Sequence, residues 1–571
     1  MDTFNLEMYV KRSLNYLNHM VDSAQVPYFN IFWTEPAEAA HDWPDLTDVM
    51  ARQLQGAIML FEMTGIESEN EADWSKKLLA LIDRDTGLVY RNKTNYNESK
   101  VEMGGHALIM YTLVSLYHKN GDPQIPVLVD KMAQSLSKIF RSDYADEEIQ
   151  FSYGFIIKSL MAAYRYCDSP AALDFAGKLV HIIMDESILF PPDNTFGERG
   201  HMHGNLRTLM GVADYALCVN DAVLFSRVDA IFRYVSSLRT SFGFLPEVAG
   251  RKGDVVSCET CALMDYIGLA ATLANAGHAD YWELIETTVR NHLVESQVKD
   301  VSWLHSDNSL EDTDQFSWRD IGERMSGGYA GWSSPTHILA AKETLNKLWG
   351  GSELKNKCRA FQNCCGGSGT HAFYIAWKNA AQFIDHTLFV NLLFDKLIEQ
   401  AEIRSFEPYE GRIEIRLKTA CCARIRVPGN AARLSYNVTV NSIKQTVNIF
   451  GNYLLLNSLS SGDYIVITYA LSHIEEIISI GNTDGRKYHY HVKWQGSTVT
   501  EISPAEEFPD EAFSDFEDEV VPVFYSEKGP GRLYLDRTGF QGVEPILAQI
   551  NFDNGEGNFW NLTKTTAKEE R

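Results

Sequence analysis

The sequence predicts two different architectures in succession, an (α/α)6 helical barrel followed by a β-sandwich. Up to about residue 385, apolar residues recur with the spacing of amphipathic helices. After about residue 386, apolar and polar residues alternate, as they do in half-buried strands. A length of 571 residues exceeds what a single compact core usually holds, so more than one domain is expected.

The helical prediction is clearest around residue 110. Ala107, Met110, Tyr111 and Val114 fall at positions i, i+3, i+4 and i+7, which places them on one face of a helix. Similar stripes recur up to about residue 385, separated by short turns such as the Asn-Gly-Asp-Pro turn at 120–123. A long series of antiparallel amphipathic helices fits a barrel of helical hairpins, whose loops at one end surround a central funnel. We assign residues 1–385 to this catalytic domain.

The second part reads as strands. The runs at 412–417 and 463–468 alternate with a period of two and are bounded by turn residues. We assign residues 386–530 to the β-sandwich. Residues 531–571 are a C-terminal segment that could return to pack on the other domains.

Charge and composition exclude some classes of partner. The formal net charge of −25 would repel nucleic acid and anionic membranes, so we expect neither as a partner. The first residues lack the basic and apolar regions of a signal peptide, and no apolar run is long enough to span a membrane. We expect a cytoplasmic protein, or one whose signal segment has been removed, with a neutral carbohydrate as its partner. A homodimer is left open.

Two short motifs carry residues suited to chemistry. Residues 258–261 read Cys-Glu-Thr-Cys, and residues 363–367 read Asn-Cys-Cys-Gly-Gly. The nine cysteines form an odd number and include adjacent pairs, which argues against a disulfide framework. Thiolates and carboxylates are ligands that Zn²⁺ prefers, and a glycine-rich turn before the helix at 371–383 would let two adjacent cysteines bind one ion. The alternative is that these cysteines are buried and inert.

These motifs resemble those of the β-L-arabinofuranosidases of glycoside hydrolase family 127 and their relatives. Glu-Thr-Cys at 259–261 and Cys-Cys at 364–365 carry the resemblance, and 390–392, 425–428 and 462–463 look like weaker matches in the sandwich. The resemblance implies an (α/α)6 barrel followed by β-sandwich domains. It also implies hydrolysis of β-L-arabinofuranoside-like glycosides with retention of configuration.

The resemblance further implies roles for individual residues. Zn²⁺ would be bound by Glu259, Cys261, Cys364 and Cys365, and the thiolate of Cys364 would be the nucleophile that attacks the anomeric carbon. The acid/base would be Glu247, in a Phe-Leu-Pro-Glu segment that ends twelve residues before Glu259, somewhat closer than is usual for the family. The alternative for Glu247 is a solvated loop carboxylate.

The resemblance fails at some positions around the expected sugar. Phe155 follows Gly154 where the family places a histidine, and glycines follow Cys-Cys in place of prolines. His106, His201 and His203 could still bind sugar hydroxyls, although helix-cap or core roles are open for each.

Aromatic and acidic residues, and a second cysteine pair, also offer alternatives. Trp332 could form a stacking platform or be packed in the core. Asp45 and Asp48 stand at a helix start, where N-capping explains them. Cys421 and Cys422 lie in a strand, so their side chains point to opposite faces and we expect them to be structural.

Two other functions compete with the glycosidase. A sugar epimerase or lyase on the same barrel would use the Cys/Glu group as a closed structural zinc site. A non-catalytic carbohydrate-binding protein would keep the scaffold without turnover.

Overall fold

The computed structural model describes most of the chain. The described residues are 4–32, 36–42, 44–91, 93–94, 103–140, 147–197, 200–249, 257–302, 304–335, 338, 341–342, 359–429, 436–481, 487–503 and 523–524. The predicted C-terminal segment 531–571 and the end of the predicted sandwich therefore lie outside them.

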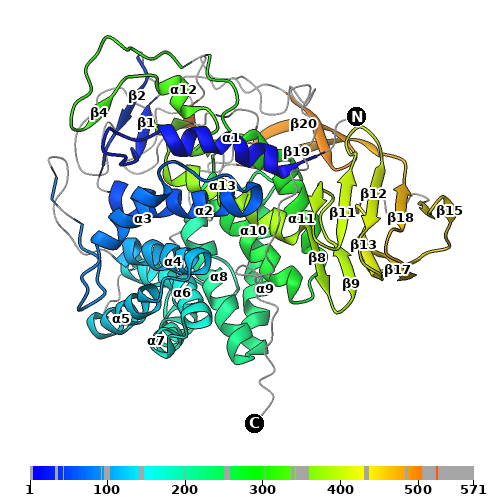
Figure 1. Cartoon of the computed structure of the whole chain (residues 1–571), viewed down its shortest axis with the longest axis horizontal. Helices are drawn as coiled ribbons and strands as arrows, with labels where there is room; N and C mark the ends of the chain where they lie inside the picture. The colour runs from blue at the N-terminus through cyan, green and yellow to red at the C-terminus, as the bar shows by residue number, and fades with distance from the viewer. Residues whose placement is uncertain are drawn as a thin grey trace.

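A closed ring of six helices forms the centre of the helical part, which confirms the predicted (α/α)6 barrel (Figure 1). Each helix contacts the next in the order α2, α4, α6, α8, α10 and α13, and α13 contacts α2 again. Their bounds are Met50–Thr64, Met103–Asn120, Glu147–Cys167, Met202–Val219, Thr260–Asn275 and Cys364–Ala380. In α10 the side chains from Thr260 to Ala274 are all buried, as expected for a helix covered on every side.

A second layer of helices packs around this ring. These helices are α1 (Leu6–His19), α3 (Glu71–Ala80), α5 (Gln124–Ile139), α7 (Pro170–His181), α9 (Ala222–Leu238) and α11 (Tyr281–Thr287). They bury one face only; in α5 the buried residues are Ile125, Leu128, Val129, Met132, Ala133 and Leu136. The stripe read from the sequence at 107–114 lies in the inner helix α4, where the intervening residues Leu108 and Ile109 are buried as well. The one-sided burial of an amphipathic helix is found in the outer layer.

Short elements connect the layers. The π-helices are η1 (Asp45–Val49), η2 (Ile182–Glu186) and η3 (Thr288–Leu293), and a short helix α12 spans Ile321–Met325. None of the described helices combines the length and the apolar character that crossing a bilayer requires.

Strands also occur within the helical part, where the sequence predicted none. One sheet has the order β22-β6-β7-β1-β2-β4. Its strands are β1 (Asn30–Phe32), β2 (Glu38–Ala40), β4 (Phe316–Ser317), β6 (Ala341–Lys342), β7 (Arg359–Gln362) and β22 (Val523–Phe524). Because Asn30 pairs with Gln362, this sheet fixes the chain immediately before Cys364.

The β-sandwich consists of two facing sheets. One has the order β10-β11-β12-β18-β14-β15 and the other β16-β17-β13-β9-β8. The first holds Lys396–Leu397, Ala401–Ser405, Arg412–Leu417, Tyr464–Thr468, Asn437–Val440 and Ile443–Lys444. The second holds Asn448–Phe450, Tyr453–Leu459, Cys421–Arg426, Thr387–Val390 and Ala381–Ile384. Ile403, Ile415 and Ile425 belong to the core between them.

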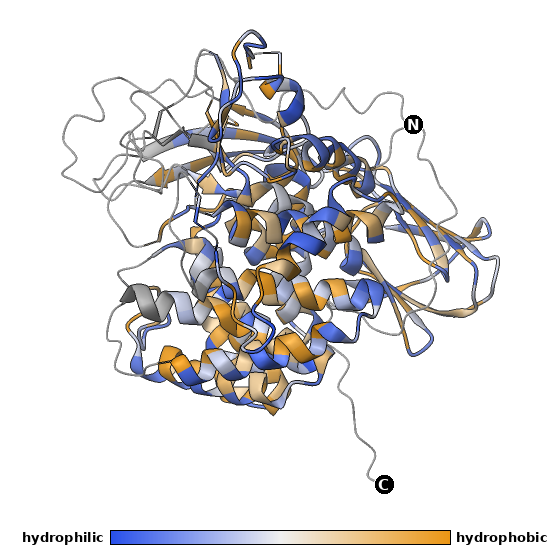
Figure 2. Cartoon of the chain, turned by 60° about the vertical axis from the view of Figure 1, so that its left-hand side comes forward, coloured by the Kyte–Doolittle hydropathy of each residue, from blue (hydrophilic) through white to orange (hydrophobic). Residues whose placement is uncertain are grey.

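The alternation read from the sequence appears directly in these strands. In β12 every second residue is buried, and Figure 2 shows hydrophobic and hydrophilic residues interleaved along the same strands. The domain limits 1–385, 386–530 and 531–571 stay predictions. Within the described residues, the strands of the two facing sheets run from Ala381 to Thr468.

A third sheet links the two parts of the molecule. It consists of β19 (His473–Gly481), β20 (Lys487–Gln495) and β21 (Thr498–Ser503). Tyr490, Val492 and Val499 from this sheet belong to the core of the helical part rather than to the sandwich core. The chain therefore returns from the sandwich to pack against the barrel.

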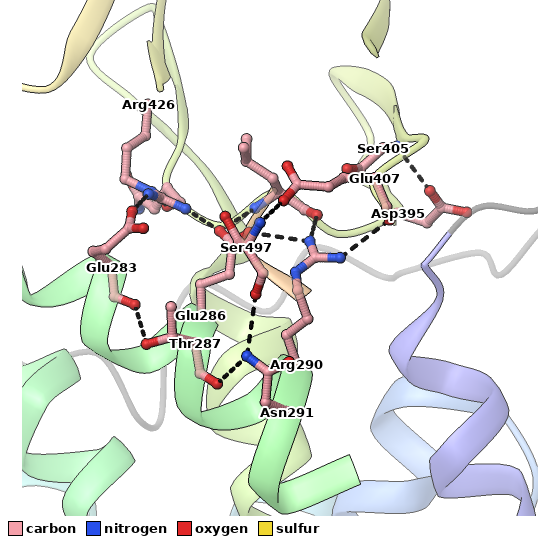
Figure 3. A network of polar contacts seen from close by, with 12 residues as sticks. Glu283, Glu286, Thr287, Arg290, Asn291, Asp395, Ser405, Glu407, Arg426 and Ser497 are labelled. Carbon is pink, nitrogen blue, oxygen red and sulfur yellow. Dashed lines mark hydrogen bonds and ion pairs between the residues drawn. The ribbon is translucent and has the colours of Figure 1, made fainter. Parts of the chain in front are cut away.

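Buried ion pairs fix the sandwich to the barrel (Figure 3). Arg426 on β13 contacts both Glu283 and Glu286 on α11. One turn further, Arg290 on η3 contacts Glu286 at 3.0 Å and donates to the carbonyl oxygens of Leu393 and Glu407. Although burial raises the pKa of Glu286, the two guanidinium groups lower it below its usual range.

Candidate metal centre and active site

The two cysteine motifs, about a hundred residues apart in sequence, meet at one end of the barrel. Glu259 lies on β3 (Cys258–Glu259), directly before α10, and Cys261 is in the first turn of α10. Cys364 and Cys365 open α13. Because α10 and α13 are neighbours in the ring, their first turns place these four side chains together. Helix N-termini carry partial positive charge, which favours anionic ligands there.

The geometry of this cluster fits a tetrahedral zinc site. The four ligand atoms of Glu259, Cys261, Cys364 and Cys365 all lie within 4.8 Å of one another. The sulfur of Cys365 is 3.4 Å from that of Cys261 and 4.0 Å from that of Cys364. Two sulfurs bound to one zinc ion at ~2.3 Å each would be about 3.8 Å apart. The residues present therefore suit a zinc ion in both chemistry and spacing.

The helix that carries the cysteine pair begins earlier than the sequence suggested. We predicted a glycine-rich turn before a helix at 371–383, but α13 spans Cys364–Ala380, so both cysteines are helical. The glycines serve close packing, not unusual backbone angles. A Cβ at Gly366 would collide with the ring of Tyr16, and one at Gly367 with the backbone of Arg52. The small residues let α13 approach α1 and α2 where the cysteines sit.

The three sulfurs differ in exposure and in acidity. Cys261 and Cys365 are completely buried, whereas Cys364 retains 8% of its surface exposed. Hydrogen bonds from the thiols of Cys261 and Cys365 lower the pKa of Cys364 to about 6. Burial raises the pKa of Cys261 to about 11 and that of Cys365 as well. Cys364 is thus the most accessible of these three thiols, and its pKa is lowered while those of Cys261 and Cys365 are raised.

Glu247 lies at the edge of the same site. Its carboxylate, that of Glu259 and the imidazole of His201 form a second group whose ligand atoms lie within 4.8 Å of one another. Glu247 is 6% exposed and accepts a hydrogen bond from the Ser257 hydroxyl at 3.0 Å. It is therefore not the solvated loop carboxylate of the alternative interpretation. Glu259 belongs to both groups, so Glu247 and the cysteines are parts of one site.

The three candidate histidines are placed differently. His201, with 32% of its side chain exposed, has Nε2 at 3.3 Å from a Glu259 oxygen. His203 is buried; its Nδ1 lies 2.6 Å from Asp265, and its Nε2 faces the guanidinium of Arg52. His106 is completely buried and accepts the backbone N–H of Val89, a contact that holds a loop. The structure thus places His201 next to the carboxylates. His203 lies next to Arg52, which in turn reaches the sulfur of Cys261. His106 contacts a loop backbone instead.

Trp332 lies beside the site without being an open platform. It pairs with Glu259 across the short sheet β3-β5, where β5 is Trp332–Ser333, and it is 6% exposed. Its expected stacking role stays a prediction. Cys421 lies in strand β13, as we expected, and faces the core of the sandwich.

The sequence did not single out Arg52, a buried cation beside the cysteine cluster. Its Nη1 lies 3.2 Å from Ser368 Oγ and 3.9 Å from Cys261 Sγ, while its Nη2 lies 3.1 Å from His203 Nε2. Its Nε donates to Asp48, so Asp48 is an ion-pair partner and not the N-cap that we predicted. The i, i+4 spacing of Asp48 and Arg52 was the available signal.

Phe155, where the resemblance predicted a histidine, packs among buried cations beside the site. Its ring lies 5.9 Å from the guanidinium of Arg52 and 4.9 Å from that of Arg207, measured to the ring centre. It also meets the imidazole of His203 edge-on. The phenylalanine ring therefore covers two buried guanidinium groups.

Comparisons with known proteins support the fold. No protein-family model matches the chain, and no curated protein matches its sequence. A GH127 beta-arabinofuranosidase matches with a TM-score of 0.57 at 14% identity, over 86% of this chain and 78% of that one. The GH127 beta-L-arabinofuranosidase of Geobacillus stearothermophilus T6 gives 0.52 at 13% identity, over 79% and 76%. A structure described as a glycoside hydrolase gives 0.54 at 14% identity, over 84% and 85%. This chain shares their fold, as its motifs predicted.

Proposed function

We propose that this chain is a retaining glycoside hydrolase that acts on β-L-arabinofuranoside-like substrates. In this proposal Cys364 is the nucleophile, Glu247 is the acid/base, and Glu259, Cys261, Cys364 and Cys365 bind zinc. The observation that carries it is the convergence of three thiols and two carboxylates, from separate segments, at the end of an (α/α)6 barrel. The fold shared with proteins described as GH127 β-L-arabinofuranosidases supports the choice of substrate class.

Each residue has a definite part in the reaction. The Cys364 sulfur would attack the anomeric carbon while the bond from that carbon to the leaving oxygen breaks. Glu247 would give its proton to the leaving oxygen. In the second step Glu247 would take a proton from water, whose oxygen attacks the anomeric carbon as the carbon–sulfur bond breaks. When bound, zinc would keep the sulfur anionic at neutral pH and make it a better leaving group.

The other described residues would position these groups. His201 contacts Glu259 from the exposed side of the site, where a sugar hydroxyl could also reach it. Arg52 holds His203 and Ser368 behind the sulfurs, so that the cluster keeps its shape. His106 is left out of the sugar site because its imidazole nitrogen already binds the backbone of Val89.

The decisive experiment compares Cys364→Ser with the parent on an aryl β-L-arabinofuranoside. We expect turnover to fall by ~10³-fold or more, because an alcohol is a far weaker nucleophile at neutral pH. Circular dichroism would confirm that the variant is folded, and mass spectrometry of the parent should detect a sugar attached to Cys364. Near-normal turnover by the folded variant would refute the proposal.

The same measurements separate the competing functions. An epimerase or lyase with a closed structural zinc site predicts that Cys364→Ser loses its fold, and that the parent changes the sugar without hydrolysis. A non-catalytic binding protein predicts that sugar binding survives Glu247→Gln, while the parent shows no turnover on any glycoside of a broad panel.

A further inference from the structure

A pocket separate from the metal centre lies where the barrel meets the sandwich. Its volume is about 260 Å³, and none of its lining residues belongs to the metal centre. One wall is the C-terminal end of α13, with Trp377 and Lys378. The other walls come from β8, with Phe383, and from β10 and the following turn, with Lys396 and Ile398.

Lys396 is an unusual residue to find in such a wall. It is only 6% exposed, and its Nζ lies 2.8 Å from the centre of the Trp377 ring. Among the residues that the structure describes, it forms neither a hydrogen bond nor an ion pair through its amine. A buried ammonium group without a counter-ion costs free energy, and the cation–π contact with Trp377 offsets only part of that cost, so loss of the proton or a bound anion would lower the free energy further. Burial accordingly holds the pKa of Lys396 well below its usual range.

A second amine lines the same pocket. Lys378 is in the last turn of α13, and burial also lowers its pKa. No described carboxylate forms an ion pair with it. The nearby acids are engaged elsewhere: Glu7 accepts from the Trp377 indole at 3.3 Å, Glu399 accepts from Gln400 at 3.2 Å, and Glu62 accepts from the Tyr374 hydroxyl.

We propose that this pocket binds a small organic anion, a carboxylate or a phosphate, whose charge is met by Lys396 and Lys378. The indole of Trp377 and the ring of Phe383 would contact its carbon framework. Charge-assisted hydrogen bonds from two amines in a low-dielectric pocket favour an anion strongly. The volume lies below the ~300–1,000 Å³ of pockets for larger ligands, which limits the ligand to a few carbon atoms.

Anion binding and the protonation of Lys396 are linked. An anion beside the amine stabilises the charged form, so the pKa of Lys396 rises when the ligand is bound. The other charged groups near the Lys396 amine are Lys378 and Glu7, which also influence its pKa, and Glu399 in the pocket wall. Because the pocket is separate from the cluster, this proposal does not depend on the proposed glycosidase activity.

The test uses the full chain with inorganic phosphate and acetate as probes, at constant ionic strength. Calorimetric titration should show saturable binding in the millimolar range to at least one probe, and the probe that binds identifies the head group. Lys396→Met should weaken binding by about tenfold or more, since it removes a charged hydrogen-bond donor while keeping a side chain that can pack on Trp377. Lys378→Met should weaken it less. Lys444→Met, an exposed lysine on β15, should bind like the parent.

A second measurement keeps the test independent of folding. After reductive methylation with ¹³C-formaldehyde, the resonance assigned to Lys396 should titrate at a higher pH when the bound probe is present. Absence of saturable binding by the parent to both probes would overturn the proposal, as would equal binding by folded Lys396→Met. Glycoside turnover by Lys396→Met should equal that of the parent, so a failure here is distinct from a failure of the proposed function.

Discussion

Two buried clusters in this molecule differ in how their negatively charged groups are compensated. At the junction of barrel and sandwich, Glu283 and Glu286 face Arg290 and Arg426, and backbone groups complete the contacts (Figure 3). At the end of the barrel, the carboxylate of Glu259 and three thiols lie together, and the guanidinium of Arg52 reaches one of them, the sulfur of Cys261, at 3.9 Å. Arg52 is itself paired with Asp48, so it does not balance them.

This difference separates a structural cluster from one that needs a ligand. At the junction the carboxylates meet two guanidinium groups or hydrogen-bond donors of the chain itself, Glu407 accepting from Tyr469 and from the backbone of Ser497, so this cluster holds the two parts together without a ligand. The cysteine cluster has more potential anions than cations, and a buried group of that kind either keeps its protons or binds a metal ion. The following experiments act on one cluster and use the other as the reference.

Removing the metal should have the largest effect. We expect about one zinc ion per chain, and treatment with a chelator should abolish turnover and lower the melting temperature. The loss of stability is bounded by the ~10–16 kcal/mol that zinc supplies to small zinc-folded domains. Metal analysis with thermal unfolding would measure it. Cys261→Ser, which lacks a ligand, should respond much less to the chelator; a parent that keeps full activity without zinc would contradict the assignment.

Breaking the complete cluster should cost stability alone. Arg426→Met leaves Glu286 buried with a single cation, and we expect the free energy of unfolding to fall by ~3–5 kcal/mol. Denaturant unfolding would measure the change. The double variant Arg426→Met/Glu286→Gln should recover part of the loss, because no uncompensated carboxylate remains at that position. Arg424→Met on the same strand, whose guanidinium is partly exposed, is the matched control. Equal effects of both arginines would contradict a special role for Arg426.

Arg52 should matter for catalysis without being needed for metal binding. The variant Arg52→Met removes the guanidinium that contacts both His203 and Ser368. We expect kcat/KM to fall by ~10–100-fold, because losing a residue that supports the ligands of a metal site usually has an effect of this size. Zinc content should stay near that of the parent. Arg52→Lys keeps the charge but not the fork of donors, so it should restore activity only partly. A loss of zinc equal to that in Cys261→Ser would make Arg52 essential for metal binding.

The last expected effect is a pH dependence of stability that comes from His292. Burial lowers the pKa of His292 to about 3, and its Nε2 lies 3.0 Å from Ser333, on the strand paired with β3. The unfolded chain binds this proton near pH 6.5, whereas the folded chain does not. Stability is therefore complete above pH 6.5 and falls by ~1.4 kcal/mol per pH unit below it. Unfolding of His292→Gln across pH 4–7 should show a shallower slope; an unchanged slope would assign the effect to other groups.

Much of the fold could be predicted because periodicity is local. The stripe at Ala107, Met110, Tyr111 and Val114 and the alternation at 412–417 follow from how a helix or strand presents its side chains. The start of α13 could not be placed in this way. Four residues, from Gly366 to Gly369, resemble a turn when read alone, yet the small residues are there because Tyr16, Tyr329 and the backbone of Arg52 press against the helix.

The sequence by itself determined which chemical groups the site offers: the Glu-Thr-Cys and Cys-Cys motifs, the nearby Glu247, and the acidity that disfavours nucleic acid. Only the tertiary structure decided which groups meet. It joined Arg52 to His203, placed His106 against a loop backbone, and left Lys396 beside a pocket with no counter-ion among the described residues. Residue identity is a local property, whereas burial and pairing depend on contacts between segments that the ring of helices brings together.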